Sequence, residues 1–311
     1  MKEKLARIRR SKLIYLLFLL IALLIPLFAR SNFQLMVLGM GSIAGLTVLG
    51  MVVLIGYTGL LSLGNVAFFS IGAYIMAITT TRLYINPWFG LFFSAIGAAL
   101  CGALVGIPSF KLRGPFLVII TVGFAEIIRL LSINLVELTG GPFGISLIPH
   151  LQFFGISLSR PFNFYYFVIV VLALVVFAIY RIRDSRIGRA MVSVKNDEIA
   201  AEILGINVKR IKLLSFTISA LLAGFAGGLF AAFIGYIVSD MFTPRESSLY
   251  LVMTVMGGFT PVFSAISAIV ITMLPEMLRF LQAYYLLIFS VILLVSILLV
   301  SWRQHREENS D

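Results

Sequence analysis

Residues 162–180 read FNFYYFVIVVLALVVFAIY and contain no charged side chain. The hydrocarbon core of a bilayer is about 30 Å thick, and an α-helix needs about 20 mostly apolar residues to cross it. The chain then becomes polar, because residues 181–189 read RIRDSRIGR. This change from an apolar run to a cluster of arginines predicts a membrane-spanning helix that ends at one face of the bilayer.

Apolar stretches of similar length recur along the chain. One region, residues 247–277, is interrupted by Gly257, Gly258 and Pro261, so it can form one long span or two short ones. The stretch at 13–29 follows a basic segment but precedes no small-residue cleavage site, and we expect an uncleaved first helix. The other predicted spans are residues 33–55, 66–81, 88–107, 115–131, 213–238 and 284–302.

The composition agrees with a membrane protein. The chain of 311 residues is 60% hydrophobic and 12% charged, with a mean hydropathy of +1.07. A soluble domain carries about twice that charged fraction, so lipid is the expected solvent. We therefore expect an all-α, polytopic integral membrane helical bundle with about 8–10 transmembrane segments, at least one of them broken or re-entrant. A single transmembrane domain over 1–311 would hold six spans in 13–180, an internal loop at 181–212 and the remaining spans in 213–302.

The distribution of charge predicts the orientation. The net charge is +11, and sixteen Lys and Arg residues fall in 1–12, 108–114 and 181–212. The positive-inside rule places these three segments and the N-terminus in the cytoplasm. Arg303 and Arg306 favour a cytoplasmic C-terminus as well, which requires an even number of crossings and hence two segments in 247–277. Because the basic residues lie between apolar segments rather than along one face, no nucleic-acid partner is expected.

The internal loop contains a predicted short amphipathic helix. Asn196 is the expected N-cap, Asp197 and Glu198 would lie in the first turn, and Gly205 would stop the helix after Leu204. Isoleucines at 199, 203 and 206 follow helical spacing. Such a helix can lie on lipid headgroups or dock into a groove of a partner protein, and the residues alone favour neither.

Two sets of residues resemble a known family. Residues 199–205, IAAEILG, resemble the E-A-A-x-x-x-G loop of ABC importer permeases. Longer runs resemble the branched-chain amino acid (leucine/isoleucine/valine) type of those permeases. These runs are GYTGLLSLGNVAFFSIGAY (56–74), LRGPFLVIITVGFAEIIRLL (112–131), LTGGPFGI (138–145), SRIGRAMVSVKNDEIAAEILGINV (185–208) and LPEMLR (274–279).

This resemblance implies a permease subunit in a bacterial or archaeal cytoplasmic (inner) membrane. It would form the pathway for a hydrophobic or branched-chain amino acid, together with a second homologous permease subunit, two cytoplasmic ATPases and an extracytoplasmic solute-binding protein docked on loops such as 132–161. Urea, amides or sugars are alternative solutes. The short helix would couple to the ATPases, with acidic contacts, an isoleucine docking face and two arginines at its ends. The coupling residues implied are Arg186, Gly188, Arg189, Asn196, Asp197, Glu198, Ile199, Ala200, Ala201, Glu202, Ile203 and Gly205.

Polar positions in the spans indicate a candidate pathway. Glu126 lies about 16 Å into its predicted helix, near the middle of the bilayer, and Arg129 follows on the same face. An intramembrane ion pair can line a pathway or fix helix packing. Two glycine-containing stretches can be unwound backbone facing a cavity, an outer gate, or turns. Their candidate residues are Gly56, Gly59, Ser62, Gly64 and Asn65, and then Thr139, Gly140 and Gly141.

Other features limit the possible functions. The chain contains no GxxxxGK[ST] phosphate loop, so ATP and Mg²⁺ would be bound by partner ATPases and no cofactor or enzymatic activity is expected on this chain. His150 and His305 are isolated, so we expect no metal site, and Cys101 is a lone thiol in an apolar run. A proton-driven carrier acting through Glu126 is the rival from another class. Small residues at four-residue spacing predict close helix packing at Gly41, Gly45, Ala98, Gly102, Gly106, Gly224 and Gly228.

Overall fold

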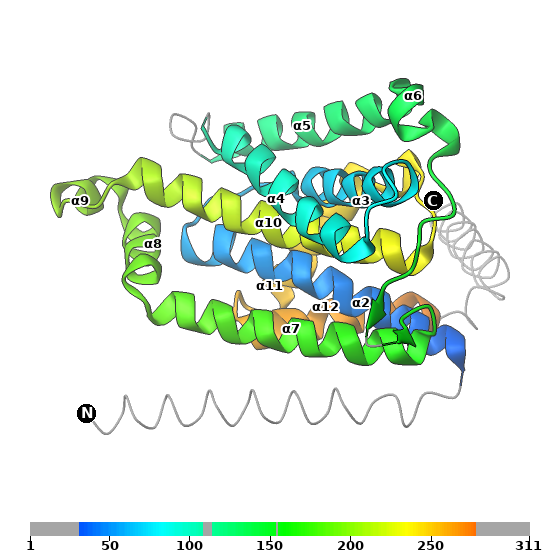
Figure 1. The fold of residues 1–311 in the computed structure, drawn as a ribbon. Helices are drawn as coiled ribbons and strands as arrows, with labels where there is room; N and C mark the ends of the chain where they lie inside the picture. The colour runs from blue at the N-terminus through cyan, green and yellow to red at the C-terminus, as the bar shows by residue number, and fades with distance from the viewer. Residues whose placement is uncertain (1–30, 108–113, 154, 278–311) are drawn as a thin grey trace, which may run out of the picture. The chain divides into compact units, whose positions relative to one another are not determined.

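The computed structural model describes residues 31–107, 114–153 and 155–277 (Figure 1). The spans predicted at 13–29 and 284–302 lie outside the described residues. Residue contacts divide the chain into two compact units, Met1–Thr272 and Met273–Asp311. All elements discussed below belong to the first unit, except that the last helix continues to Met277.

The described residues are almost entirely helical, which confirms the predicted all-α class. Five of their helices are long and apolar enough to cross a bilayer. One short antiparallel hairpin pairs Gln152 with Ser157 and Phe153 with Ile156. The elements are α2 (Asn32–Met51), η1 (Val52–Tyr57), α3 (Asn65–Thr81), α4 (Pro87–Gly106), α5 (Pro115–Asn134), α6 (Val136–Thr139), η3 (Gly141–Phe143), β1 (Gln152–Phe153), β2 (Ile156–Ser157), α7 (Pro161–Asp184), α8 (Arg186–Asn196), α9 (Glu198–Ile203), α10 (Val208–Ile234), η4 (Ser239–Met241), α11 (Pro244–Met256) and α12 (Pro261–Met277).

Simple local signals set the helix boundaries. Proline occupies the first turn of α4, α5, α7 and α11, where its missing N–H costs nothing and its φ suits a helix. The Asn86 side chain also caps α4 by accepting a hydrogen bond from Trp88 N at 3.0 Å. At the C-terminal end of α10, Gly235 adopts φ +80° and the helix ends at Ile234. This end lies four residues before residue 238, where the predicted span ends.

Helices α2 and α10 form the centre of the bundle. In the apolar stretch formed by α2 and η1, 94% is buried inside the bundle. In the apolar stretch of α5, only 22% is buried. Helix α10 packs against α4, α3 and α2, and α2 also packs against α7 and α11. A helix that is apolar on all sides is expected in such a central position. Helix α5 lies at the edge of the bundle (Figure 1).

Small residues allow α10 to approach its neighbours closely, as the sequence predicts. A Cβ added at Gly102 would lie 2.2 Å from the Cβ of Ala220, and one at Gly224 would lie 2.1 Å from the Cβ of Ala98. Helix α3 approaches equally closely, because a Cβ at Gly72 would lie 2.0 Å from the carbonyl oxygen of Gly224. These helices are therefore held by backbone-level packing that larger side chains would prevent.

The region 247–277 forms two short helices rather than one long span. Helix α11 has 13 residues, or about 20 Å, and is too short to cross a 30 Å core alone. The chain breaks between α11 and α12, where Phe259 adopts φ +55° and Gly258 adopts φ +60°. A Cβ at Gly257 would lie 2.3 Å from Ser264 Cα, so this break is tightly packed. The prediction of a broken segment is confirmed.

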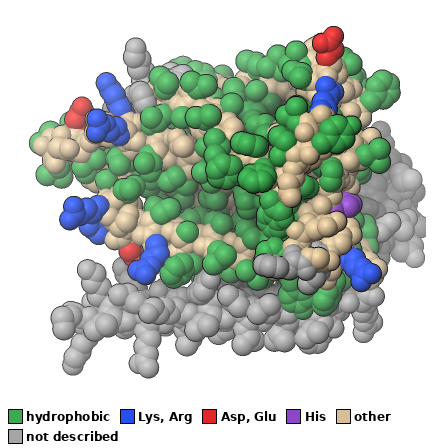
Figure 2. Space-filling view, viewed as in Figure 1, with side chains coloured by type: hydrophobic (Ala, Val, Ile, Leu, Met, Phe, Trp, Pro, Cys, Tyr) green, Lys and Arg blue, Asp and Glu red, His purple; other side chains and the backbone are tan. Residues whose placement is uncertain are grey.

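The surface of the bundle suits lipid. Hydrophobic side chains cover the middle of the face shown in Figure 2, while Lys, Arg, Asp and Glu gather toward the ends of the helices. On α4, one exposed stripe follows helical spacing, and its opposite face packs into the bundle. The stripe consists of Phe89, Phe93, Ile96, Leu100 and Leu104. Such a face is stable only in an apolar environment or against another protein.

Candidate functional site

The chain loses regular α-helical structure where α2 ends. Residues 52–57 form the π-helix η1, and residues 58–64, here called the 58–64 loop, are irregular before α3 begins at Asn65. A π-helical segment inside a span is uncommon and often occurs at functional sites. Within this region Gly56 is buried and Gly59 adopts φ +73°. The sequence left open unwound backbone or a tight turn, and the structure shows an irregular stretch of seven residues.

Three helices hold the 58–64 loop and the start of α3. The amide of Leu63 donates to Thr121 Oγ1 of α5 at 3.1 Å. The Asn65 side chain donates to Ser219 Oγ of α10 at 3.1 Å, and the amide of Val66 donates to Ser247 Oγ of α11 at 3.1 Å. Ser62 is also buried, and its hydroxyl accepts a hydrogen bond from Gly64 N. Irregular backbone at membrane depth requires this kind of satisfaction by protein groups.

Helices α8 and α9, here called the α8–α9 segment, connect α7 to α10 at one end of the bundle (Figure 1). Ser185 caps α8 by accepting a hydrogen bond from Gly188 N at 3.2 Å. A Cβ at Gly188 would lie 2.2 Å from Ile182 O, so the turn from α7 into α8 requires a glycine there. Met191 and Val194 are buried, and α8 packs against α7, α10 and η1. The sequence pattern did not indicate α8 as a separate helix.

The predicted N-cap of the short helix is wrong by one residue. Asn196 is the last residue of α8, and Asp197 caps α9 instead, with extended backbone at φ −157°. The Asp197 carboxylate accepts hydrogen bonds from Ile199 N at 2.8 Å and Ala200 N at 3.1 Å. Both Asn and Asp are good caps, and the one that follows the end of α8 is the one free to adopt cap geometry. Asp197 therefore has a structural role within the chain.

The predicted C-terminal stop is confirmed. Gly205 adopts φ +80°, and its amide donates to Glu202 O at 3.0 Å. The amide of Ile206 donates to Ala201 O at 3.0 Å, which completes a Schellman motif. Asn207 then caps α10 by accepting a hydrogen bond from Arg210 N at 3.0 Å. Helix α9 is short, but side-chain or backbone caps satisfy both of its ends.

Helix α9 presents a small apolar surface. The exposed fractions are 62% for Ile199, 81% for Ile203 and 76% for Leu204, while Ala201 is fully buried against the bundle. We call the three exposed residues the α9 apolar surface. Sequence spacing placed Ile199 and Ile203 on one face, and the structure adds Leu204. Glu202 beside them is also exposed.

Glu198 points toward the bundle rather than outward. Its Oε1 lies 2.7 Å from Nζ of Lys212, which is 1% exposed and lies in the first turns of α10. In the sequence, Lys212 is one of many basic residues in the internal loop. Three cationic residues follow α9 within ten positions of Gly205, so the sequence alone does not show which one pairs. The two arginines predicted at the ends of the short helix differ in their contacts. Arg189 donates a hydrogen bond to Asp184 O at 2.9 Å, and Arg186 is exposed.

A pocket of about 300 Å³ lies between the α8–α9 segment, the 58–64 loop and the start of α5. Lys195 of α8 reaches across this region, and its Nζ donates to Gly56 O of η1 at 2.8 Å. The structure thus brings together the predicted pathway glycines, Gly56 and Gly59, and the predicted coupling residues of the α8–α9 segment. The lining residues are Thr58, Gly59, Leu60, Leu61, Gly114, Leu117, Val194, Lys195, Asn196, Asp197, Glu198 and Ile199.

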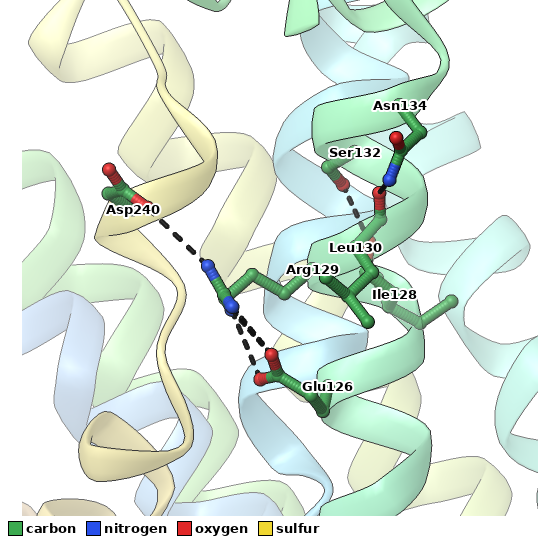
Figure 3. A network of polar contacts seen from close by, with 7 residues as sticks. All are labelled: Glu126, Ile128, Arg129, Leu130, Ser132, Asn134 and Asp240. Atoms are coloured by element: carbon green, nitrogen blue, oxygen red, sulfur yellow. Dashed lines mark hydrogen bonds and ion pairs between the residues drawn. The ribbon is translucent and has the colours of Figure 1, made fainter. Parts of the chain in front are cut away.

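The predicted ion pair forms in the middle of α5 (Figure 3). Arg129 Nε donates to both carboxylate oxygens of Glu126, at 3.0 and 3.1 Å, and its Nη2 donates to Oε1 at 2.5 Å. Arg129 Nη1 also lies 3.6 Å from Oδ1 of Asp240 in η4, a partner that the sequence did not indicate. Charged groups at this depth normally face a bundle interior or a water-filled space.

The glycines at the other end of α5 form a turn. Thr139 is buried, and its hydroxyl bonds to Ser132 O at 2.7 Å and Leu135 O at 2.8 Å. Gly140 and Gly141 have φ values of +76° and +61°, so both positions require glycine-like backbone. The three predicted pathway groups therefore do not form one site. They follow α5 in order, from the 58–64 loop near Thr121, past the ion pair, to this turn.

The described residues contain no cluster of three or more His, Cys, Asp or Glu that could hold a metal ion. His150 has a structural contact, because its Nδ1 lies 2.7 Å from Ala232 O near the end of α10. Cys101 is a free thiol in α4. The candidate site is a set of membrane-helix breaks and ion pairs, together with the α8–α9 segment at one end of the bundle (Figure 1).

Long apolar helices define a polytopic membrane protein. Breaks in two of its membrane segments and a helical segment beyond the ends of the spans are typical of transporters. Residues 33–298 match the family described as the permease component of the branched-chain amino acid transport system. The chain belongs to this family, which confirms the resemblance seen in the sequence.

Curated relatives agree with this assignment. The high-affinity branched-chain amino acid transport system permease proteins LivM of Escherichia coli (strain K12) and Salmonella typhimurium are each 38% identical over 279 residues, covering 82% of this chain. A probable LivM permease of Methanocaldococcus jannaschii is 24% identical over 181 residues, covering 56% of this chain and 52% of the relative. The match spans 65% of the length of the first two relatives. No solved structure matches the chain.

Proposed function

We propose that this chain is the membrane-spanning permease subunit of an ATP-driven importer of branched-chain or other hydrophobic amino acids. The proposal is supported by family membership and by the names of the LivM relatives. In this proposal a second homologous permease subunit completes the pathway. Two cytoplasmic ATPases supply energy, and an extracytoplasmic solute-binding protein delivers the solute. The protein lies in the cytoplasmic membrane with both termini inside.

One structural observation carries the link to the ATPases: the α9 apolar surface on a well-capped helix outside the bundle. Ile199, Ile203 and Leu204 are the kind of exposed, spaced apolar side chains that fill a groove on a partner protein. An interfacial helix on lipid is the alternative. The acidic Glu202 beside the surface disfavours contact with an anionic leaflet, so a protein partner fits better.

The pathway proposal rests on helix α5 and the 58–64 loop. Glu126 and Arg129 lie on α5, a helix at the edge of the bundle, and form a network with Asp240 of η4. This network needs water or a second polypeptide beside it. A pathway shared with a second permease subunit provides both. A zwitterionic amino acid has one group that can bind Arg129 and another that can bind Glu126 or Asp240.

A reconstitution experiment tests the proposal. Proteoliposomes containing both permeases and both ATPases, with the binding protein outside and ATP inside, should accumulate leucine. The chain alone with a proton gradient should accumulate none. Leucine uptake by the chain alone, driven by the proton gradient, would instead support the proton-driven carrier.

A matched pair of variants tests the docking surface. The double variant Ile199→Asp/Ile203→Asp should lose recovery of the ATPases in a detergent pull-down, because charges replace an apolar contact. Leu147→Asp is the control, since Leu147 is 90% exposed in the connection between η3 and β1, away from the α8–α9 segment. Equal recovery of the ATPases by both variants would contradict docking at α9.

A further inference from the structure

Lys195 of the α8–α9 segment contacts two irregular regions of the described membrane helices. Its Nζ donates to Gly56 O in η1 at 2.8 Å and lies 5.7 Å from the ring centroid of Phe259, in the break between α11 and α12. The donor and its acceptor are separated by 139 residues. A single side chain therefore connects α8 to two different membrane segments.

The stem of this side chain lies close to the 58–64 loop, although Lys195 as a whole remains exposed. A Cβ at Gly59 would lie 3.1 Å from Lys195 Cγ, and a Cβ at Gly56 would lie 3.1 Å from Phe259 Cβ. The glycines at these positions thus leave room for the lysine stem and the phenylalanine ring. Gly56 and Gly59 were predicted pathway residues, and the closeness of Phe259 and Lys195 gives a more specific reason for glycine at these positions.

The chemistry of the contact suits a connection that can be remade. The last carbonyls of a helix lack partners within the helix, and a cation is favourable beside them. An ammonium group on a flexible stem can follow such a carbonyl through a small displacement. The Phe259 ring face adds a cation–π contact. By contrast, Glu198 joins Lys212 on α10, which is a continuous helix, and this pair fixes α9 in place.

We propose that Lys195 is the positioning residue that transmits movement of the α8–α9 segment to η1 and to the α11–α12 break. This inference rests on the proposed function, because it assumes that partner ATPases move the segment. A shift of α8 moves Lys195, and Lys195 then moves both the Gly56 carbonyl and the Phe259 ring. The two membrane-helix breaks therefore change at the same time. Lys195 touches neither solute nor nucleotide in this scheme.

The test uses the complete reconstituted complex with the wild-type chain and four variants of it. Lys195→Met keeps most of the apolar stem but removes the donor, and Lys195→Arg restores a charged donor. Lys209→Met is the matched control, since it removes an exposed positive charge from the same part of the chain. ATPase recovery, ATP hydrolysis and leucine uptake per ATP hydrolysed are measured for each form.

We expect Lys195→Met to retain the ATPases and to hydrolyse ATP, but to lose uptake per ATP by about tenfold, as for the loss of a hydrogen bond to a charged group. Lys195→Arg should recover most of this loss, and Lys209→Met should behave like the wild type. Phe259→Leu removes only the ring face and should lower uptake per ATP by about threefold. If Lys195→Met does not insert stably in the membrane, Phe259→Leu still tests the inference.

Two results would overturn the inference while leaving the proposed function intact. One is wild-type uptake per ATP in Lys195→Met, or in Phe259→Leu where only that variant is recovered. The other is loss of ATPase recovery in Lys195→Met, which would make Lys195 part of the docking site only. Failure of the wild-type complex to couple uptake to ATP would overturn both the inference and the proposed function.

Discussion

Two ion pairs occupy different regions of this protein and have different consequences. Glu126 and Arg129 lie three residues apart on one membrane helix, and both side chains remain partly exposed. Glu198 and Lys212 lie on two different helices outside the apolar part of the bundle, and Lys212 is fully buried. A pair within one helix stabilises that helix only slightly, whereas a buried pair between helices determines where they sit relative to each other.

This difference separates a candidate solute contact from a candidate mechanical contact. The α5 pair has a second acidic neighbour, Asp240, so its charges can be shared among several groups. Such a network can exchange partners with a passing solute at small cost to the fold. The Glu198–Lys212 pair holds α9 against α10, and loss of either partner leaves a charge that burial penalises.

The largest expected effect follows from breaking the buried pair. Glu198→Gln leaves the Lys212 ammonium buried without a carboxylate, and removal of one partner of a buried pair costs about 3–5 kcal/mol. We expect α9 to open locally, seen as faster amide hydrogen exchange at residues 199–206 in the purified chain. The double variant Glu198→Gln/Lys212→Met should regain much of the protection, since it buries no charge. Unchanged protection in the single variant would show that the pair does not hold α9.

A smaller effect is expected from the cap of α9. Asp197→Ala removes two hydrogen bonds to the first turn and should destabilise α9 by about 1 kcal/mol, measured by hydrogen exchange. Asp197→Asn should be nearly neutral, because an amide oxygen can also cap a helix. Asn196→Ala tests the one-residue difference between sequence and structure. If Asn196→Ala lowered the stability of α9 more than Asp197→Ala does, Asn196 and not Asp197 would be the N-cap.

The smallest effect on stability is expected in α5. Glu126→Gln leaves Arg129 beside Asp240 and removes a pair within one helix, a contact worth about 0.2–0.5 kcal/mol on a helix surface. Thermal unfolding in detergent should therefore change by no more than about 2 °C, while leucine uptake by the complete complex should fall. A large loss of thermal stability with normal uptake would assign the pair to structure alone.

Much of the fold could be predicted because each span needs a certain apolar length. The prediction of 66–81 differs from α3 (Asn65–Thr81) by one residue, and that of 88–107 differs from α4 (Pro87–Gly106) by one at each end. The prediction for α10 failed at both ends. Its start includes charged residues after the Asn207 cap, and Gly235 ends it early.

The candidate site could be predicted only where local signals define it. The Gly205 stop and the Glu126–Arg129 pair depend on residues close in sequence, and both were found. The contacts of Lys195 with Gly56 and of Lys212 with Glu198 were missed. The first joins segments 139 residues apart, and the second requires a choice among several nearby cations. A single sequence contains no signal for such choices.

Contact between α9 and a partner ATPase is the central requirement of the proposed function, and a photo-crosslink from Ile203 tests this contact directly. A photoreactive amino acid replaces Ile203, which is 81% exposed, in the complete complex in native membranes. We expect an adduct between this chain and an ATPase subunit, and no such adduct from the same group at Leu147. Adducts with lipid alone at Ile203, in membranes where the ATPases are present and active, would contradict the proposed contact.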